Sequence, residues 1–162
     1  MHLQLLFTKL KDMTTNLEES HNIAWRLFLT THARLDELIE QELAQAGLPP
    51  LAWYDVLWSL ENAPSHQLRL HELAEAIVLR RSNLTRLVDR LETAGLVYRE
   101  SCPSDRRGAF AVITEAGLAM RQQMWPTYAQ AINKYFASHL SDAETEVLTK
   151  VMRRLLAAAR KE

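Results

Sequence analysis

Polar and cationic side chains recur between residues 82 and 90 at spacings that place them on one side of a helix. They are Ser82, Asn83, Thr85, Arg86 and Arg90. Short hydroxyl and amide groups can hydrogen-bond to base edges or phosphates, and an arginine can donate two parallel hydrogen bonds to a guanine edge. These residue types therefore suit the major groove of duplex DNA. The alternative is a solvated polar face, which is the commoner condition of an arbitrary helix.

The residues between them predict the helix that would carry this group. Leu84, Leu87, Val88 and Leu91 fall at positions i, i+3, i+4 and i+7, so one side of the helix should turn to a core. We expect this helix to begin near residue 81 and to stop at a glycine, residue 95, with a shorter helix over 71–77 before it. Two short helices separated by a tight turn form a helix-turn-helix unit.

A β-hairpin is predicted next, because two short apolar segments flank a polar one. We expect this wing over about residues 97–113, with Asp105, Arg106 and Arg107 at its tip. An arginine suits the narrow minor groove, where negative potential is concentrated. Asp105 would orient one arginine through a charge-assisted pair and leave the other free to enter. Which arginine does which stays open, and taken alone this tripeptide usually marks a solvated turn.

Charge is concentrated in this part of the chain. The segment from Arg80 to Arg107 holds seven arginines and four acids, about +3, whereas the whole chain of 162 residues is -1. A near-neutral chain is not a nonspecific polycation, so DNA binding would have to come from a local patch. A hydrophobic content of 48% with 24% charged residues indicates one globular domain with a core.

The elements around this segment are predicted to be long helices, because helical spacing dominates and glycine and proline are few. We expect a first long helix over about 16–46 that stops at Gly47, a second over 51–61 after Pro49-Pro50, a third over about 115–139, and a last one capped by Ser141 and Glu144. The predicted fold class is mainly α. Its parts are an N-terminal extension over 1–15 and one domain over 16–162, with a winged helix-turn-helix head over 51–114 and dimerisation helices over 16–48 and 115–162.

Apolar stripes on the long helices predict self-association. The first and last helices, together with Leu118, Trp125, Tyr128, Ile132 and Phe136, carry more apolar surface than a small head could cover. A twofold homodimer would bury it. Such a dimer would bind a pseudo-palindromic DNA site whose half-sites lie about 10 bp apart, or a multiple of that spacing.

Several motifs together resemble the MarR (multiple antibiotic resistance regulator) family of dimeric winged-helix transcription factors. They are Leu73-Ala74, residues 82–92, Gly95-Leu96-Val97, Arg99, Asp105-Arg106-Arg107, and Val112-Ile113-Thr114-Glu115-Ala116-Gly117. The resemblance covers roughly residues 17–156. It implies that the polar group from Ser82 to Arg90 contacts the major groove and its phosphates, and that Arg106 or Arg107 enters the minor groove. It also implies interlocked terminal helices and, more often than not, a repressor released by an effector.

The resemblance further implies a site for a small aromatic or phenolic acid between the dimer helices and the head. Trp25, His32, Trp53 and Trp58 lie on the helices that would form its walls. The alternative for each tryptophan is packing in a core or a dimer contact, since large aromatics dominate burial. The alternative for His32 is a buried or interface histidine, against a ligand-anchoring or pH-responsive group.

Other functions find little support in the sequence. We expect no metal and no cofactor, and an enzyme is the weakest hypothesis, because no catalytic triad, phosphate-binding loop or metal-ligand spacing is present. Cys102 is interpreted as a structural thiol rather than a redox sensor. A signal peptide and a membrane span are not expected, which favours the cytosol. The second hypothesis is a winged helix that docks a protein, although such an interface would be more apolar at its centre.

Overall fold

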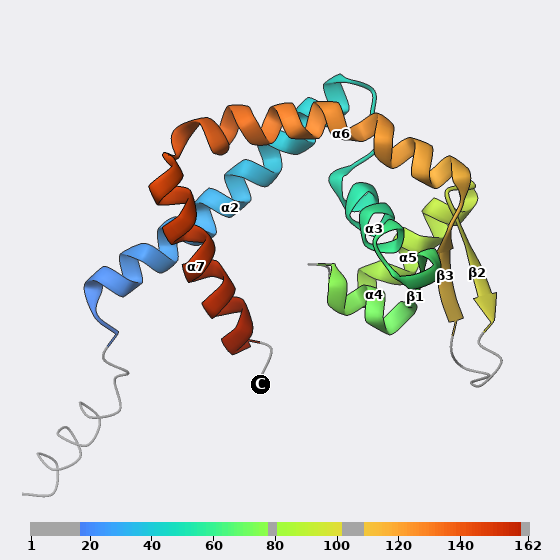
Figure 1. Ribbon diagram of the computed structural model, residues 1–162, viewed down its shortest axis with the longest axis horizontal. Coiled ribbons are helices and arrows are strands. Elements are labelled where there is room, and N and C mark those ends of the chain that lie inside the picture. Colours follow the sequence, from blue (N-terminus) through green and yellow to red (C-terminus); the bar gives the residue numbers. More distant parts are fainter. Residues whose placement is uncertain (1–16, 78–80, 102–108, 160–162) are drawn as a thin grey trace, which may run out of the picture. The chain divides into compact units, whose positions relative to one another are not determined.

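The computed structural model describes residues 17–77, 81–101 and 109–159 (Figure 1). The chain divides into two compact units, Met1–Asp36 and Glu37–Glu162. The fold is mainly helical, with one small antiparallel sheet. The elements in chain order are α2 (Glu19–Gln45), α3 (Leu51–Glu61), a 3-10 turn (Pro64–His66), β1 (Gln67–Arg69), α4 (Leu70–Ala76), α5 (Arg81–Thr93), β2 (Val97–Ser101), β3 (Ala109–Ile113), α6 (Glu115–Tyr135), a second 3-10 turn (Ala137–His139) and α7 (Asp142–Ala159).

The first unit contributes the N-terminal two-thirds of α2. The helix begins at Glu19 rather than at the expected residue 16, because Leu17 and Glu18 are not helical. Aromatic rings follow one another along it, with 6.0 Å between the ring centroids of Trp25 and Phe28 and 6.5 Å between those of Phe28 and His32. None of the described residues of this unit is buried, so its apolar side chains lie open in the single subunit.

The second unit holds the core of the head. Figure 1 shows α3, α4 and α5 gathered beside the three-stranded sheet. Leu57 and Leu60 of α3, Leu73 of α4, and Val88 and Leu91 of α5 have no exposed surface. They form one continuous cluster with residues of the sheet. The apolar side predicted for α5 is therefore the side that anchors it to the rest of the head.

The sheet has the strand order β1-β3-β2, and both pairings are antiparallel. β2 and β3 form a hairpin in which Val97 pairs with Ile113 and Ser101 with Ala109. Val97 and Ile113 are the two ends expected for the wing. β1 is the short strand Gln67–Arg69, whose residues pair with Phe110 to Val112. The sheet thereby joins the wing to the segment that leads into the helix-turn-helix.

Two glycines end helices as the sequence predicts. Gly47 (φ +68°) follows α2 and Gly95 (φ +73°) follows α5, in the left-handed conformation that glycine adopts without penalty. After α5, the Leu96 N–H donates to the Leu91 carbonyl at 2.9 Å and the Gly95 N–H to the Glu92 carbonyl at 2.9 Å. The same pair of bonds closes α2. Both ends are Schellman motifs, which satisfy the last carbonyls of the helix.

The C-terminal helices differ from expectation at one end. α6 is continuous through Pro126 but ends at Tyr135 rather than His139, because Phe136 leaves the helical conformation (φ -132°, ψ -64°). The capping box before α7 is present: the Ser141 N–H donates to Glu144 Oε2 at 2.9 Å, and the Glu144 N–H donates to Ser141 Oγ at 3.4 Å. The Ser141 hydroxyl also donates to Glu144 Oε2, at 2.7 Å, and the bonds from the Ser141 N–H and hydroxyl to this carboxylate lower the pKa of Glu144. No helix in the described ranges is long and apolar enough to cross a membrane.

Part of the apolar surface assigned to dimer contact instead packs within the subunit. Leu118 packs against the core of the head. Tyr128 lies against the second core cluster, with its ring centroid 4.9 Å from that of buried Tyr54 on α3. Trp125 stacks on Tyr54 at 6.1 Å while remaining 45% exposed. The sequence pattern predicted the apolar side of α6 correctly, but α3 of the same subunit covers part of that side.

Candidate nucleic-acid interface

The two sides of α5 differ sharply in burial. Leu84, Leu87, Val88 and Leu91 are buried in the head. On the opposite side, the predicted groove-reading residues whose side chains are described are all exposed, and they are Asn83, Thr85, Arg86 and Arg90. The side chain of Ser82 lies outside the described part of the structure. The exposed side is therefore polar, cationic and free of large apolar groups, as base and phosphate contacts require.

α4 supports α5 from the N-terminal side of the helix-turn-helix. Leu73 and Ile77 are buried in the same core as α5. The start of α4 is fixed by Glu72, whose Oε2 accepts the Arg69 N–H at 2.9 Å. The orientation of α5 thus depends on core packing against α4 and α3, which gives its exposed side a rigid support.

Arg99 of β2 binds the exposed side of α5. Its guanidinium contacts the Glu92 carboxylate, lies 2.5 Å from Asp89 Oδ1 and donates to the Thr85 carbonyl at 3.4 Å. The Arg99 N–H also donates to Glu92 Oε1 at 3.0 Å. Burial lowers the pKa of Arg99, but the hydrogen bonds and charges of Asp89 and Glu92 outweigh it and raise the pKa overall. The network fastens the wing to the helix and neutralises two acids beside the candidate DNA-contacting residues.

The sequence pattern did not predict this role of Arg99. A signal was present: Asp89 and Glu92 are three residues apart, so they share a helix side, and an arginine stands in the middle of the next strand. The sequence did not indicate that β2 passes close enough to α5 to join them. That proximity depends on the tight turn at Gly95.

Thr114 and Gly117 fix the other side of the wing base. The Thr114 hydroxyl donates to the Gly95 carbonyl at 2.8 Å and accepts the Gly117 N–H at 3.0 Å, which caps α6. A Cβ on Gly117 would lie 2.2 Å from the Leu96 carbonyl oxygen and 2.7 Å from a side-chain carbon of Ile113. The end of α5, the last residues of β3 and the start of α6 therefore meet at one close contact.

Some predicted site residues lie outside the described residues. These are Asp105, Arg106 and Arg107 at the expected tip of the wing, together with Cys102. The structure describes the two strands that lead to them. Minor-groove contact by this tripeptide therefore stays a prediction.

The four residues suggested for an effector site divide between the two units. Trp25, 56% exposed, and His32, also exposed, belong to the first unit. His32 is therefore not buried within a single subunit. In the second unit, Trp53 is partly buried and packs against the core of the head, which agrees with the alternative that this tryptophan serves in packing. Trp58 is 51% exposed. Within the described ranges, no group of three His, Cys, Asp or Glu could hold a metal ion.

Comparisons with known proteins agree on one family. A model of the MarR family matches residues 46–108. The HTH-type transcriptional regulator MhqR of Bacillus subtilis (strain 168) is 35% identical over 123 residues, which are 75% of this chain and 81% of the relative.

Solved structures agree with this match. AbsC, a MarR family transcriptional regulator from Streptomyces coelicolor, is 31% identical with a TM-score of 0.80, over 92% of this chain and 100% of AbsC. Sco3205 from the same organism, solved in complex with DNA, is 30% identical with a TM-score of 0.79, over 88% of this chain and 89% of Sco3205.

Proposed function

Because this chain belongs to the MarR family of DNA-binding transcriptional regulators, we propose that it acts as a homodimeric repressor at a pseudo-palindromic operator. The family assignment separates the earlier hypotheses. The chain is a transcriptional regulator that binds DNA, rather than an enzyme or a protein-docking module. The proposal adds its oligomeric state, its direction of control and the residues that contact DNA.

The observation that carries the proposal is the exposed polar side of α5. Asn83 and Thr85 lie near the N-terminus of the helix, where short side chains can approach base edges. Arg86 follows within one turn and is the candidate for a guanine, whereas Arg90 is better placed for a phosphate. Ser82 joins this set from its position in the sequence. All five would act from a helix that its buried side holds in place.

The wing would add contacts in the adjacent minor groove. Arg106 or Arg107 would enter it while Asp105 pairs with the other arginine. Support comes from the antiparallel pairing of β2 with β3, in which Ser101 and Ala109, the described residues on either side of this segment in the sequence, are partners. Arg99 would act indirectly by holding that hairpin against α5.

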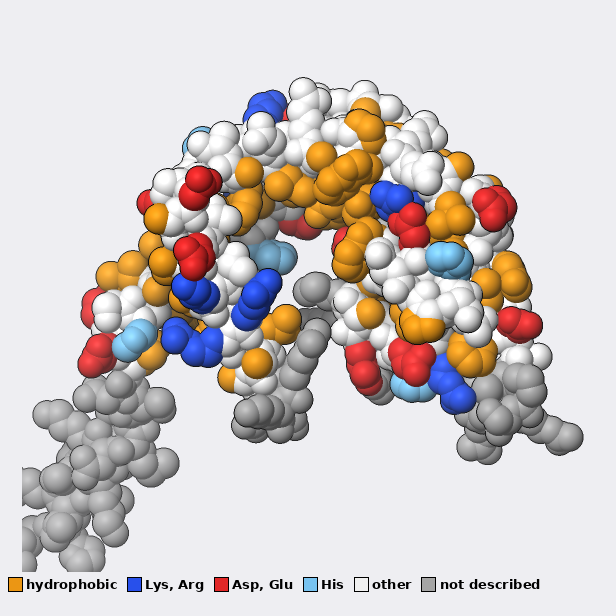
Figure 2. All heavy atoms as spheres, viewed as in Figure 1, with side chains coloured by type: hydrophobic (Ala, Val, Ile, Leu, Met, Phe, Trp, Pro, Cys, Tyr) orange, Lys and Arg blue, Asp and Glu red, His pale blue; other side chains and the backbone are white. Residues whose placement is uncertain are grey.

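A homodimer is supported by apolar surface that the subunit leaves open. No residue of α7 is buried. Three of its large apolar side chains, those of Val147, Leu155 and Leu156, are each more than half exposed. Figure 2 shows hydrophobic side chains among basic ones along this helix. Exposed apolar surface of this extent is characteristic of an interface, and a twofold dimer would pair the two heads with two half-sites.

Binding-site selection on purified protein tests this function. We expect an enriched inverted repeat with half-site centres about 10 bp apart or a multiple of that spacing. In the Arg86→Ala variant, discrimination at one base pair of each half-site should fall by about 1–3 kcal/mol. Lys150→Ala, which removes an exposed cation from α7, is the matched control and should select the parent site. Recovery of no motif by the parent protein would refute the proposal.

An aromatic acid is the effector that we propose for release from DNA. Trp58 is the preferred contact because it is exposed on α3, and Trp25 and His32 are exposed on α2. Binding would favour release if the acid has higher affinity for the form that cannot bind DNA. Titrating the operator complex with salicylate and related acids while following DNA anisotropy tests this step. Equal release from the parent and from Trp58→Ala would exclude Trp58 as a contact.

A further inference from the structure

Arg69 of β1 is a cation of the head that belongs neither to α5 nor to the expected tip of the wing. Its guanidinium carbon lies 5.5 Å from the centroid of the Phe110 ring, and the two residues are direct partners in the antiparallel pairing of β1 with β3. Both residues are partly exposed. A phenyl ring offers no acceptor oxygen, so this cation–π contact orients the guanidinium and leaves its N–H donors for an anion.

The backbone at Arg69 is fixed as well as the side chain. Its N–H donates to Glu72 Oε2 at 2.9 Å, and its pairing with Phe110 holds it in the edge strand of the sheet. Among the residues that the structure describes, no carboxylate forms an ion pair with the Arg69 guanidinium. The positive charge is therefore held in place without being neutralised by a described side chain.

Arg69 also lies next to two elements that DNA should approach. In helix-turn-helix proteins the second helix lies in the major groove and the first helix crosses the phosphate backbone. The first helix here is α4, and Arg69 directly precedes its first residue, Leu70. Phe110 is the second residue of β3, close in the sequence to the expected tip of the wing. The start of α4 and the wing therefore meet at the Arg69–Phe110 pair.

We propose that Arg69, held over Phe110, contacts a DNA phosphate between the major groove that α5 enters and the adjacent minor groove that the wing enters. The inference rests on the proposed function and adds to it one contact in each half-site. Phosphate contacts fix the register of a protein on the duplex without reading its sequence, and an arginine can make them bidentate. A guanidinium that a ring already orients loses less rotamer freedom on binding.

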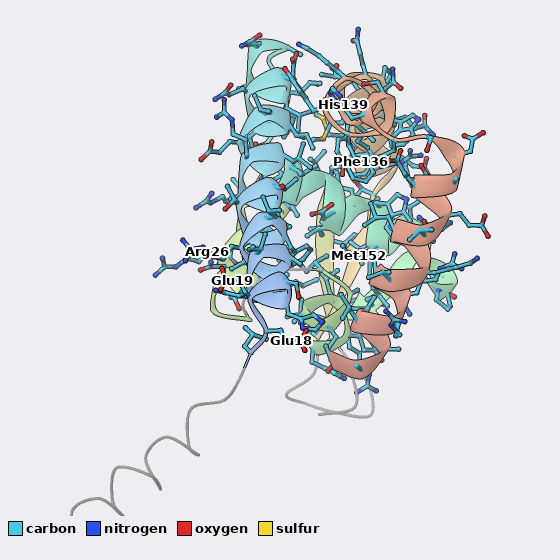
Figure 3. All side chains as sticks on the ribbon, turned by 90° about the vertical axis from the view of Figure 1, so that its left-hand side faces the viewer. Glu18, Glu19, Arg26, Phe136, His139 and Met152 are labelled. Carbon is cyan, nitrogen blue, oxygen red and sulfur yellow. The ribbon has the colours of Figure 1, made fainter. Side chains whose placement is uncertain are left out.

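The salt dependence of operator binding tests whether Arg69 neutralises a phosphate. Arg69→Gln should make the slope of log affinity against log salt concentration shallower by about 1.8, because one phosphate contact is lost in each of two subunits. Arg69→Lys keeps the charge and should keep the slope of the parent. Arg26→Gln is the matched control and should also keep it, since Arg26 is exposed and extends away from α2 (Figure 3). An unaltered slope in Arg69→Gln would overturn the proposal.

Neutral linkages in the DNA locate the contact and separate it from any loss of stability. A methylphosphonate replaces one phosphate of the operator at a time, and anisotropy compares the parent with Arg69→Gln. At one position in each half-site the parent should lose about tenfold in affinity, whereas the variant should lose little because its side of the contact is already absent. A variant that loses as much as the parent at every position would exclude the contact, whatever its stability.

Phe110→Leu tests the role of the ring. It removes the cation–π contact but keeps an apolar side chain, so it should weaken operator binding by about threefold in the parent and leave Arg69→Gln unchanged. Equal losses in both backgrounds would contradict the orienting role of Phe110.

The outcomes separate this inference from the proposed function. A parent that selects no operator would refute both. A slope change near 0.9 would support the phosphate contact while refuting the homodimer, because it corresponds to one contact for each bound protein. A parent that binds its operator as a dimer, with a slope that Arg69→Gln leaves unaltered, would refute this inference alone.

Discussion

At the scale of single residues, Arg99 illustrates how a side chain can matter for DNA binding without lying among the groove-contacting residues. Its side chain is 27% exposed, and its guanidinium joins Asp89 and Glu92 on α5 to the wing strand β2. Ion pairs with this degree of exposure contribute little to stability. Their effect on binding is larger, because an unpaired Asp89 would direct a negative charge toward the phosphates.

We therefore expect Arg99→Gln to lower operator affinity by about tenfold or more while the free energy of unfolding falls by only about 1 kcal/mol. Anisotropy titrations and urea unfolding measure the two quantities. The double variant Arg99→Gln/Asp89→Asn removes the repulsive charge and should recover part of the affinity. A variant that loses affinity only in proportion to lost stability would contradict this role.

At the scale of elements, the junction of α5, β3 and α6 leaves no room for a side chain at Gly117. An added Cβ would meet the backbone oxygen of Leu96 at 2.2 Å, which only a shift of the chain could relieve. We expect Gly117→Ala to destabilise the protein by about 2 kcal/mol, since overpacking outweighs the better helix propensity of alanine. Chemical unfolding checks this value. Ala116→Ser, at the exposed neighbouring position, should change stability by less than about 0.5 kcal/mol.

Glu42 joins the last turns of α2 to the end of α6. Its Oε1 accepts hydrogen bonds from Lys134 Nζ at 2.8 Å and the Tyr135 hydroxyl at 2.5 Å. These bonds, first that of Lys134 and then that of Tyr135, lower the pKa of Glu42 below its ordinary value of 4.5. The carboxylate therefore stabilises the fold above that value, and the contribution is lost as the pH falls through the lowered pKa.

We expect Glu42→Gln to unfold at lower denaturant concentration than the parent at pH 7, and the difference to shrink as the pH falls below about 4.5. Urea midpoints from pH 7 to pH 3, at one protein concentration, measure it. Glu100→Gln, an exposed carboxylate on β2, is the control and should stay near the parent. A parent-to-variant difference that grows toward low pH would have the wrong sign for this ion pair.

The elements also separate what the sequence could predict from what it could not. Helical periodicity and the stops at Gly47 and Gly95 predicted α2, α3 and α5 because those signals are local. The predicted end of α6 was wrong by four residues, because no local sequence signal marks the change of backbone conformation at Phe136. Arg99 and the packing of Tyr128 on Tyr54 depend on how distant segments meet, which periodicity does not encode. At the site, the same periodicity sufficed to place Asn83 and Arg86 outward.

At the scale of the whole molecule, affinity would come from two heads acting together. Each subunit presents one α5 and one wing, so every cation removed from the chain removes two from the proposed dimer. Binding by counterion release makes this count measurable, because the logarithm of affinity falls with the logarithm of salt by about 0.9 for each phosphate charge neutralised. Salt dependence can therefore separate one groove-inserted arginine per wing from two.

We expect the double variant Arg106→Ala/Arg107→Ala to bind operator more weakly across sequences and with a shallower salt dependence. If one arginine per subunit neutralises a phosphate and Asp105 holds the other, the slope of log affinity against log salt concentration should become shallower by about 1.8. If both arginines of each subunit neutralise phosphates, the slope should become shallower by about 3.6. Anisotropy titrations at several salt concentrations give the slope, and Lys150→Ala should leave it unchanged. The single variants then identify the inserted residue, since only its loss should reproduce the change. An unaltered slope and affinity in the double variant would remove the wing from the DNA interface.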